Sequence, residues 1–174
     1  SMEKANVVGI YGQNGSGKTT IVEAFSLLKL LLSGNTLPEK SEYLIQDGQK
    51  SIHITFDFLI QNCLGTFEST YACTLEQDDS NLFVTKEMLS LRENIPRHRV
   101  KILIQKDGDA IQINKTALQD ISEKERIQIM LANKMALAQH ASFIFDKNLN
   151  EVLSHELNKT EIEIIKNLKE DFNN

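Results

Sequence analysis

The chain has 174 residues, enough for one domain with an apolar core. Hydrophobic residues make up 41% of it and charged residues 25%, and the formal net charge is −5. This acidic balance argues against a general nucleic-acid or membrane footprint, and no stretch reaches the ~18 uninterrupted apolar residues that a membrane-spanning helix needs.

The two cysteines, Cys63 and Cys73, lack metal-ligand spacing and are expected to be thiols of a cytoplasmic protein. Ser1 before Met2 looks like the remnant of a cleaved tag, and the far end stops inside a charged helical pattern. We therefore expect residues 1–174 to form a single, truncated domain.

The chain begins with a strand and a helix. Residues 6–11 form a short apolar run that ends at Gly12, a pattern typical of a buried parallel strand. A helical pattern follows over residues 18–33, and Gly34 supplies its C-terminal stop. The predicted core face of this helix consists of Ile21, Val22, Phe25, Leu28 and Leu32.

The middle of the chain changes to a period of two. Ile52, Ile54, Phe56 and Phe58 alternate with polar residues, as in a strand with one buried face. Further strands are predicted over residues 66–75, 82–91, 98–105 and 110–113, with turn residues at 78–81 and 107–109. The sequence predicts an antiparallel meander here.

Helices return at the end of the chain. Ser122 and Glu125 have capping-box spacing, and the helix they introduce has a predicted apolar face of Ile127, Met130, Leu131, Met135 and Ala138. A second helical stretch runs from about residue 149 towards 172, with a predicted break at Thr160. The predicted fold class is α/β: a P-loop core over residues 5–34, an antiparallel β lobe over 51–114 and a helical part over 116–174.

A glycine-rich motif lies between the first strand and helix. Residues 12–19 match G-x-x-x-x-G-K-[ST] at every fixed position. Glycines at this spacing let successive backbone N–H groups point at phosphate oxygens, and the following helix adds the positive end of its dipole. Lys18 is expected to reach the β- and γ-phosphates, and the Thr19 hydroxyl to bind Mg²⁺. We predict that ATP is bound by Gly12, Gln13, Asn14, Gly15, Ser16, Gly17, Lys18, Thr19 and Thr20.

The region around this motif resembles the opening of ATPase heads of the RecF, SMC and OLD type, which are AAA-family, ABC-type P-loop ATPases. Those families typically have an Asn before Gly-Ser-Gly-Lys, matched here by Asn14, and a Glu-Ala or Asp-Ala pair in the helix, matched by Glu23-Ala24. The resemblance is specific over residues 7–26. It implies that two heads form a homodimer through ATP, with DNA or a nuclease as a partner of the intact protein in DNA maintenance or phage defence.

The acidic pair that completes such a site is absent from the sequence. Hydrolysis in this class needs an apolar strand that ends in an Asp, followed by a Glu that polarises water. The nearest candidate is Asp146, but Lys147 stands where the Glu should be, so an Asp that ends a strand or caps a helix is the favoured reading. This chain is expected to hydrolyse ATP slowly or not at all.

Three further features have two readings each. The resemblance implies a glutamine that senses Mg²⁺ and the γ-phosphate, for which Gln139 and then Gln61 are candidates; an exposed helical glutamine is the alternative. Leu32-Ser-Gly-Asn35 is similar to the start of an ATP-binding-cassette signature, but Gly34 as a helix cap fits better. A basic cluster could contact nucleic-acid phosphates or form a solvated hairpin turn; it consists of Arg92, Arg97, His98, Arg99 and Lys101.

Two other functions compete with the ATPase head. A small P-loop kinase that phosphorylates a metabolite or nucleoside would suit the length and the motif, but such kinases alternate strands and helices. A non-catalytic docking module would use the meander and the last helices as its binding surface.

Overall fold

The computed structural model describes residues 5–11, 17–39 and 50–171. These residues form a seven-stranded sheet and four α-helices. The strands are β1 Ala5–Tyr11, β2 Ser51–Asn62, β3 Gly65–Gln77, β4 Leu82–Glu93, β5 Lys101–Asp107, β6 Ala110–Ile113 and β7 Thr116–Ala117. The helices are α1 Gly17–Ser33, α2 Glu123–Ala138, α3 Leu149–Glu156 and α4 Lys159–Asp171.

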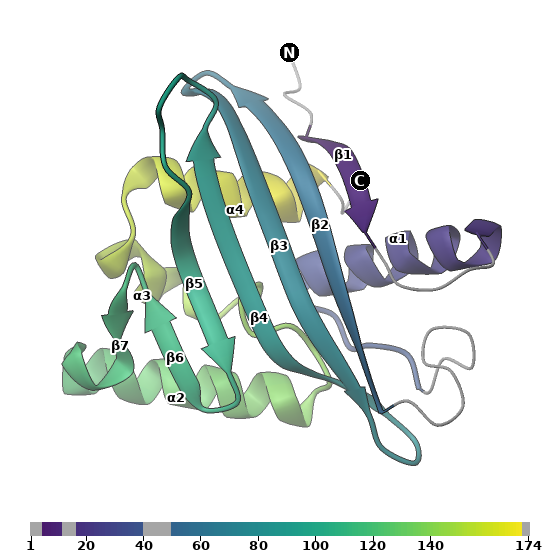
Figure 1. Cartoon of the computed structure of the whole chain (residues 1–174). Helices are drawn as coiled ribbons and strands as arrows, with labels where there is room; N and C mark the ends of the chain where they lie inside the picture. Colours follow the sequence, from purple (N-terminus) through teal and green to yellow (C-terminus); the bar gives the residue numbers. More distant parts are fainter. Residues whose placement is uncertain (1–4, 12–16, 40–49, 172–174) are drawn as a thin grey trace.

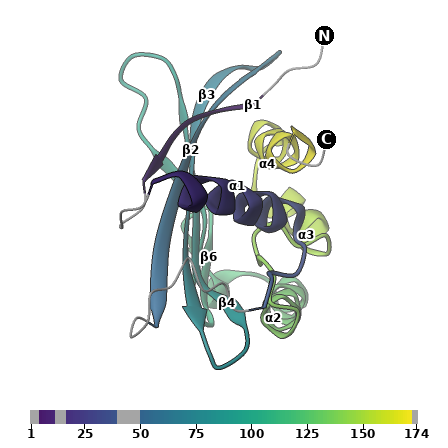
Figure 2. The same cartoon turned by 90° about the vertical axis from the view of Figure 1, so that its right-hand side faces the viewer.

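The sheet is antiparallel throughout, and its strands lie side by side in sequence order. The four helices cover one face of this twisted sheet, as Figures 1 and 2 show. The long strands β2, β3 and β4 therefore have one face in the core, and the predicted alternation along β2 is confirmed by buried Ile54, Phe56 and Phe58. No helix in the described part of the chain is long and apolar enough to span a bilayer.

The meander predicted from the sequence is confirmed, and so is the first strand, but the prediction that this strand is parallel to its neighbours is wrong. β1 runs antiparallel to β2, from the Ala5–Ile60 pair to the Tyr11–Thr55 pair. It lies at one end of the strand order, so in the described residues it is an edge strand and no parallel partner flanks it.

β7 was not predicted. Asn114 and Lys115, both with positive φ, make the tight turn that leads into it.

Gly34 ends α1 and brings it against the loop before α3. Gly34 has φ +65°, its N–H donates to Leu31 O at 3.1 Å, and the N–H of Asn35 donates to Leu30 O at 3.0 Å. This is the Schellman closure of a helix, so the predicted cap is confirmed. A Cβ atom on Gly34 would lie 2.7 Å from the carbonyl oxygen of Phe145. Only glycine fits this contact without a shift of backbone.

We expect Gly34→Ala to lower the free energy of unfolding by about 2–3 kcal/mol, of which the left-handed backbone accounts for about 1–2 kcal/mol. The rest comes from the contact with Phe145. Gly108→Ala is the matched control, because Gly108 has φ +58° and nothing lies within 4 Å of its Cβ position. Urea denaturation measures both losses. Equal losses in the two variants would contradict the contribution of the Phe145 contact.

In the predicted core face of α1, Leu28 and Leu32 are buried as expected and the other three residues are exposed, whereas the predicted face of α2 is wrong. In α1 the buried residues are Ala24, Leu27, Leu28, Leu31 and Leu32. In α2 they are Ile129, Ala132, Asn133 and Ala136, whereas the predicted face is exposed: Ile127, Met130, Leu131, Met135 and Ala138. α2 packs against α3 and β4, and two of its four buried residues are alanines.

The helix starts also differ in detail from the sequence pattern. α2 begins after Ser122 as predicted, but the Ser122 hydroxyl donates to the Glu125 carboxylate at 2.6 Å and makes no hydrogen bond to the backbone. A reciprocal capping box forms instead at α4. The N–H of Asn158 donates to Glu161 Oε1 at 3.1 Å, and the N–H of Glu161 donates to Asn158 Oδ1 at 2.9 Å. The break between the last helices therefore lies before Lys159, slightly earlier than predicted.

Candidate nucleotide-binding site

The glycine-rich motif lies where a strand ends and a helix begins. β1 ends at Tyr11 and α1 begins at Gly17. Gly12, Gln13, Asn14, Gly15 and Ser16 lie outside the described residues, and Gly17, Lys18, Thr19 and Thr20 form the first turn of α1. The first N–H groups of an α-helix have no partner within the helix and carry the positive end of its dipole. Strand, loop and helix thus follow in the order that a phosphate-binding loop requires.

The start of α1 is fixed relative to the sheet by three kinds of contact. β1 is hydrogen-bonded to β2 along its length. The buried stripe of α1, from Ala24 to Leu32, packs into the common core. α4 contacts both α1 and β1. This framework positions the motif from both of its ends.

The opening turns of α1 present apolar side chains to solvent. Ile21, Val22 and Phe25 are 51%, 66% and 40% exposed, so their predicted place in the core is wrong. Oε2 of Glu23 is buried and has no hydrogen-bond partner among the described residues. A buried carboxylate oxygen without a hydrogen-bond donor is costly, so Glu23, three residues after Thr20, has one acceptor that the described residues do not satisfy.

Gln139 lies at the other end of α1. Gln139 ends α2, and its N–H donates to Met135 O at 2.9 Å. The next residue, His140, accepts the N–H of Leu37 at its carbonyl oxygen, at 2.8 Å. Leu37 follows the C-terminus of α1, whose 17 residues span about 25 Å. This placement argues against contact between Gln139 and a phosphate held at the start of α1 in the same chain.

Gln61 is also remote from the motif. The last residue of β1, Tyr11, pairs with Thr55, while Gln61 lies six residues further along β2, beyond the Ala5–Ile60 pair. Six residues of strand span about 20 Å. Neither glutamine is therefore brought to the motif by the described fold.

Asp146 lies in a loop and not at the end of a strand. The apolar residues Phe143 and Phe145 before it are buried in this loop, between α2 and α3. Asp146 Oδ1 accepts the N–H of Asn148 at 2.7 Å, just before α3 begins. Asp146 thus orders the entrance to a helix, which is one of the two favoured readings of the sequence; the other, an Asp at the end of a strand, is wrong. In the described part of the chain, no group of three or more His, Cys, Asp or Glu side chains could hold a metal ion.

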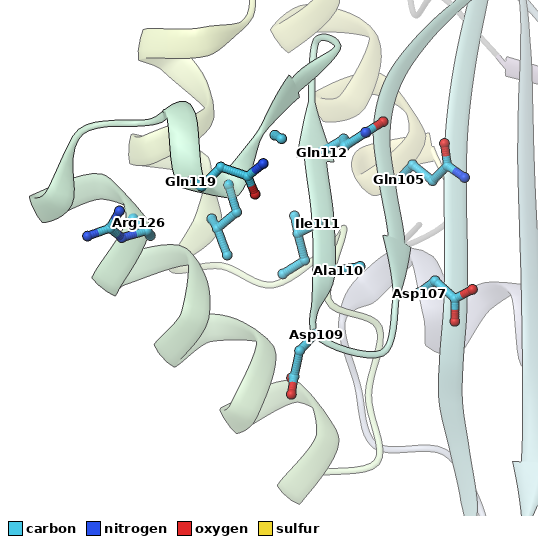
Figure 3. Close-up of a pocket in the computed structure, with 10 residues that line it drawn as sticks. Gln105, Asp107, Asp109, Ala110, Ile111, Gln112, Gln119 and Arg126 are labelled. Atoms are coloured by element: carbon cyan, nitrogen blue, oxygen red, sulfur yellow. The ribbon is translucent and has the colours of Figure 1, made fainter.

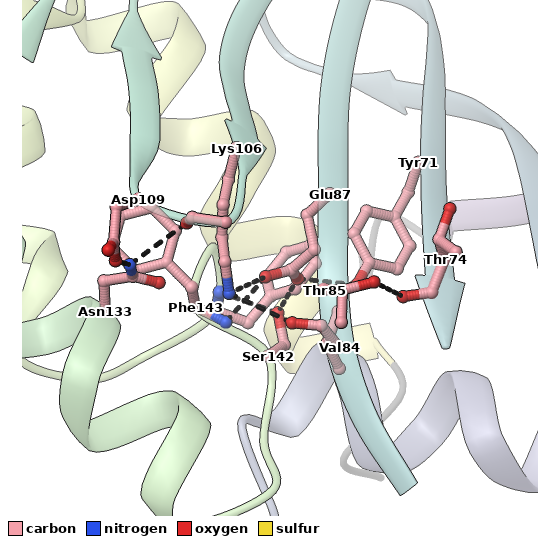
Figure 4. A network of polar contacts seen from close by, with 12 residues as sticks. Tyr71, Thr74, Val84, Thr85, Glu87, Lys106, Asp109, Asn133, Ser142 and Phe143 are labelled. Carbon is pink, nitrogen blue, oxygen red and sulfur yellow. Dashed lines mark hydrogen bonds and ion pairs between the residues drawn. The ribbon is translucent and has the colours of Figure 1, made fainter. Parts of the chain in front are cut away.

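A buried polar network, which the sequence did not reveal, holds this loop on the sheet (Figure 4). The Glu87 carboxylate accepts the Tyr71 hydroxyl and the Phe143 N–H, each at 2.8 Å, and also the Ser142 hydroxyl. Lys106 Nζ lies 4.0 Å from Glu87 and 5.7 Å from the centre of the Phe143 ring. Both charged side chains are fully buried.

The protonation of this network follows from its burial. Burial, together with the charge of Glu87, raises the pKa of Tyr71 well above its ordinary value, so its hydroxyl stays a donor. Burial lowers the pKa of Lys106, while the charges of Glu87 and Asp109 act in the opposite direction. The network is thus a structural anchor in which every oxygen of Glu87 has a donor.

A separate pocket of about 510 Å³ lies at the opposite edge of the sheet, between β6 and the start of α2 (Figure 3). Asp107 and Asp109 supply carboxylates and Arg126 a cation, and glutamines supply most of the remaining polar groups. One cation beside two carboxylates does not suit a triphosphate. The pocket therefore does not compete with the motif as a nucleotide site.

Comparisons with known proteins identify the family of the chain. A family model described as an AAA domain matches residues 3–174. The Retron Vc95 probable ATPase of Vibrio cholerae serotype O1 biovar El Tor is 34% identical over 85 residues, which are 47% of this chain and 16% of that relative. No solved structure matches the chain. Because the family match covers nearly every residue, the chain belongs to the AAA domain family and is of the RecF, SMC and OLD kind of ATPase.

Proposed function

We propose that this chain binds ATP with Mg²⁺ through residues 12–20. The observation that carries the proposal is the complete motif at a strand-to-helix junction within an AAA domain. Backbone N–H groups of residues 12–17 would surround the phosphates, Lys18 would neutralise the β- and γ-phosphates, and Thr19 would hold Mg²⁺. An AAA domain implies nucleotide binding, which supports this assignment.

In the intact protein, two heads would close on ATP and hydrolyse it as a homodimer. The relative's name, a probable ATPase of a retron, supports hydrolysis of ATP as the activity. From the resemblance to RecF, SMC and OLD heads we place this activity in the cytoplasm, in DNA maintenance or phage defence, with DNA or a nuclease as the partner. The matched residues are 16% of that relative, so the acidic residues for hydrolysis would come from other parts of an intact protein.

The antiparallel sheet favours this proposal over a small P-loop kinase. Kinases of that type alternate strands and helices and so have parallel sheets. All seven described strands here are antiparallel to their neighbours. Phosphoryl transfer to a member of a nucleoside panel would favour the kinase instead.

Titration with ATP tests the proposal directly. Calorimetry should show saturable binding of ATP that is tighter with Mg²⁺ than with EDTA, because the metal neutralises phosphate charge. Light scattering should show a larger mass with Mg²⁺–ATP than without it. Absence of binding by the folded chain would refute the nucleotide site. Binding without a change in mass would retain the site and refute the ATP-dependent dimer of this chain.

A further inference from the structure

The loop between β4 and β5, residues 94–100, carries a positive charge that contrasts with the rest of the chain. From Arg92 to Lys101 there are four Lys or Arg side chains and one carboxylate, a net charge of +3 in a chain whose net charge is −5. This loop projects from the end of the sheet, at the upper left of both views in Figures 1 and 2. In Figure 2 it lies on the side away from the helices.

Two of the nearby cations, Arg92 and Lys101, are neutralised within the fold, and His98 contacts a carboxylate. Arg92 pairs with Glu68, and His98 lies 3.4 Å from Glu93. Lys101 Nζ lies 2.8 Å from the largely buried Glu161. These ion pairs belong to the structure of the hairpin and of α4, so they do not explain the remaining cations.

Arg97 and Arg99 are exposed, and neither has an ion-pair partner among the described residues. Arginine side chains match phosphate oxygens with two parallel hydrogen bonds and are weakly hydrated. Exposed Ile95 and Val100 flank this pair, at 48% and 62% exposure. The loop therefore offers two free guanidinium groups between small apolar side chains.

The backbone at Arg97 shows that the fold does not favour an arginine there. The N–H of His98 donates to Ile95 O at 3.3 Å, which closes a turn with Pro96 in its second position. Arg97 occupies the third position with φ +70°, a backbone conformation in which glycine or asparagine is preferred. Arg97 is thus kept at a conformational cost, which points to a use for its side chain.

We propose that the loop of residues 94–100 binds the phosphate backbone of a nucleic-acid duplex through Arg97 and Arg99. The positive charges of Arg97 and Arg99 favour a polyanion as the ligand. The loop has no Phe, Tyr or Trp, so it lacks both the large stacking rings that hold single strands and the Trp or Tyr anchors of membrane surfaces. Contact with phosphates alone predicts little sequence preference and a strong dependence on salt.

Fluorescence anisotropy with a labelled DNA duplex of mixed sequence tests this surface, without nucleotide present. We expect the duplex to bind at low salt. The logarithm of the association constant should fall with the logarithm of the salt concentration with a slope of about −2, as for two phosphate contacts. The double variant Arg97→Gly with Arg99→Ala should weaken binding by about tenfold or more. Its unfolding midpoint should stay the same or rise, because glycine suits the turn.

The control removes two other exposed cations, by Lys124→Ala with Lys134→Ala on α2. Both double variants change the net charge equally, but only the arginine variant should lose binding. Equal losses would overturn the proposal, as would failure of the native chain to bind the duplex at low salt. A second experiment measures binding to vesicles that contain anionic lipid. Tighter binding to vesicles than to the duplex would also overturn it.

Discussion

Replacing Glu87 with alanine is expected to lower the free energy of unfolding by about 3–5 kcal/mol. The substitution leaves the buried Lys106 cation with the carbonyl oxygen of Val84 and the ring of Phe143 as its contacts. It also removes the acceptor for the Tyr71 and Ser142 hydroxyls. A buried cation and unsatisfied buried donors are among the most costly defects in a protein interior.

Urea denaturation measures this loss, and the neighbouring residue provides the control. Lys86 pairs with Asp107 at 3.0 Å, but both side chains are more than half exposed. Lys86→Ala should therefore change stability by less than about 1 kcal/mol. In the double variant Glu87→Gln with Lys106→Met, the loss should be smaller than for Glu87→Ala, because no charge remains buried. Similar losses for Glu87→Ala and Lys86→Ala would show that the buried network does not stabilise the fold.

This network could not be predicted from local alternation, because an irregularity in β4 reverses the order of its faces. Alternation from Val84 would place Lys86 in the core and Glu87 towards solvent. The register shift between Thr74 and Leu75 instead sets Lys86 opposite Thr74 and Val84 opposite Leu75, which leaves Thr85 as an extra residue. Every later residue of β4 changes face, so Glu87 enters the core. A bulge depends on pairing with the next strand, which local alternation does not encode.

Strand order was easier to predict than helix orientation. Alternation and short turns fixed the meander, because neighbouring strands of a hairpin must pair. The predicted face was wrong for α2 and partly wrong for α1, where Leu28 and Leu32 are buried but Phe25 is exposed, because both helices carry apolar residues on more than one side. α2 buries Ala132 and Ala136 and leaves Met130 and Leu131 exposed. Size and hydrophobicity do not decide between such sides; the neighbours of the helix do.

In the candidate site, the consecutive residues of the motif were easier to predict than residues that lie far from it in the sequence. The motif of residues 12–19 was read from local spacing, because a phosphate-binding loop is built from consecutive residues. The proposed sensors, Gln139 and Gln61, required long-range geometry, and the described fold places both far from the motif. Residues that act through the local backbone can be predicted from sequence, whereas residues brought together by folding need the structure.

Replacing Lys18 with alanine is expected to weaken ATP binding by roughly 100-fold, because the substitution removes charge-assisted hydrogen bonds worth about 1.5–3 kcal/mol each. Calorimetry with Mg²⁺–ATP measures the change. Thermal unfolding without nucleotide should be unaffected, since Lys18 lies in the first turn of α1 and alanine favours a helix. Unfolding with saturating ATP should show stabilisation of the native chain and little of the variant.

Lys29 on the same helix separates the specific contact from a general effect of charge. Lys29 is exposed, and three turns of α1 separate it from Lys18. Lys29→Ala changes the net charge by the same amount, but about 16 Å of helix separates it from the phosphates, beyond the Debye length at physiological salt. ATP affinity should therefore remain within about twofold of the native value in this variant. If both variants lost affinity equally, the nucleotide would be held by the overall field of the chain. If neither did, ATP would bind elsewhere, because a phosphate-binding loop without its lysine lacks the cation that opposes the charge of the β- and γ-phosphates.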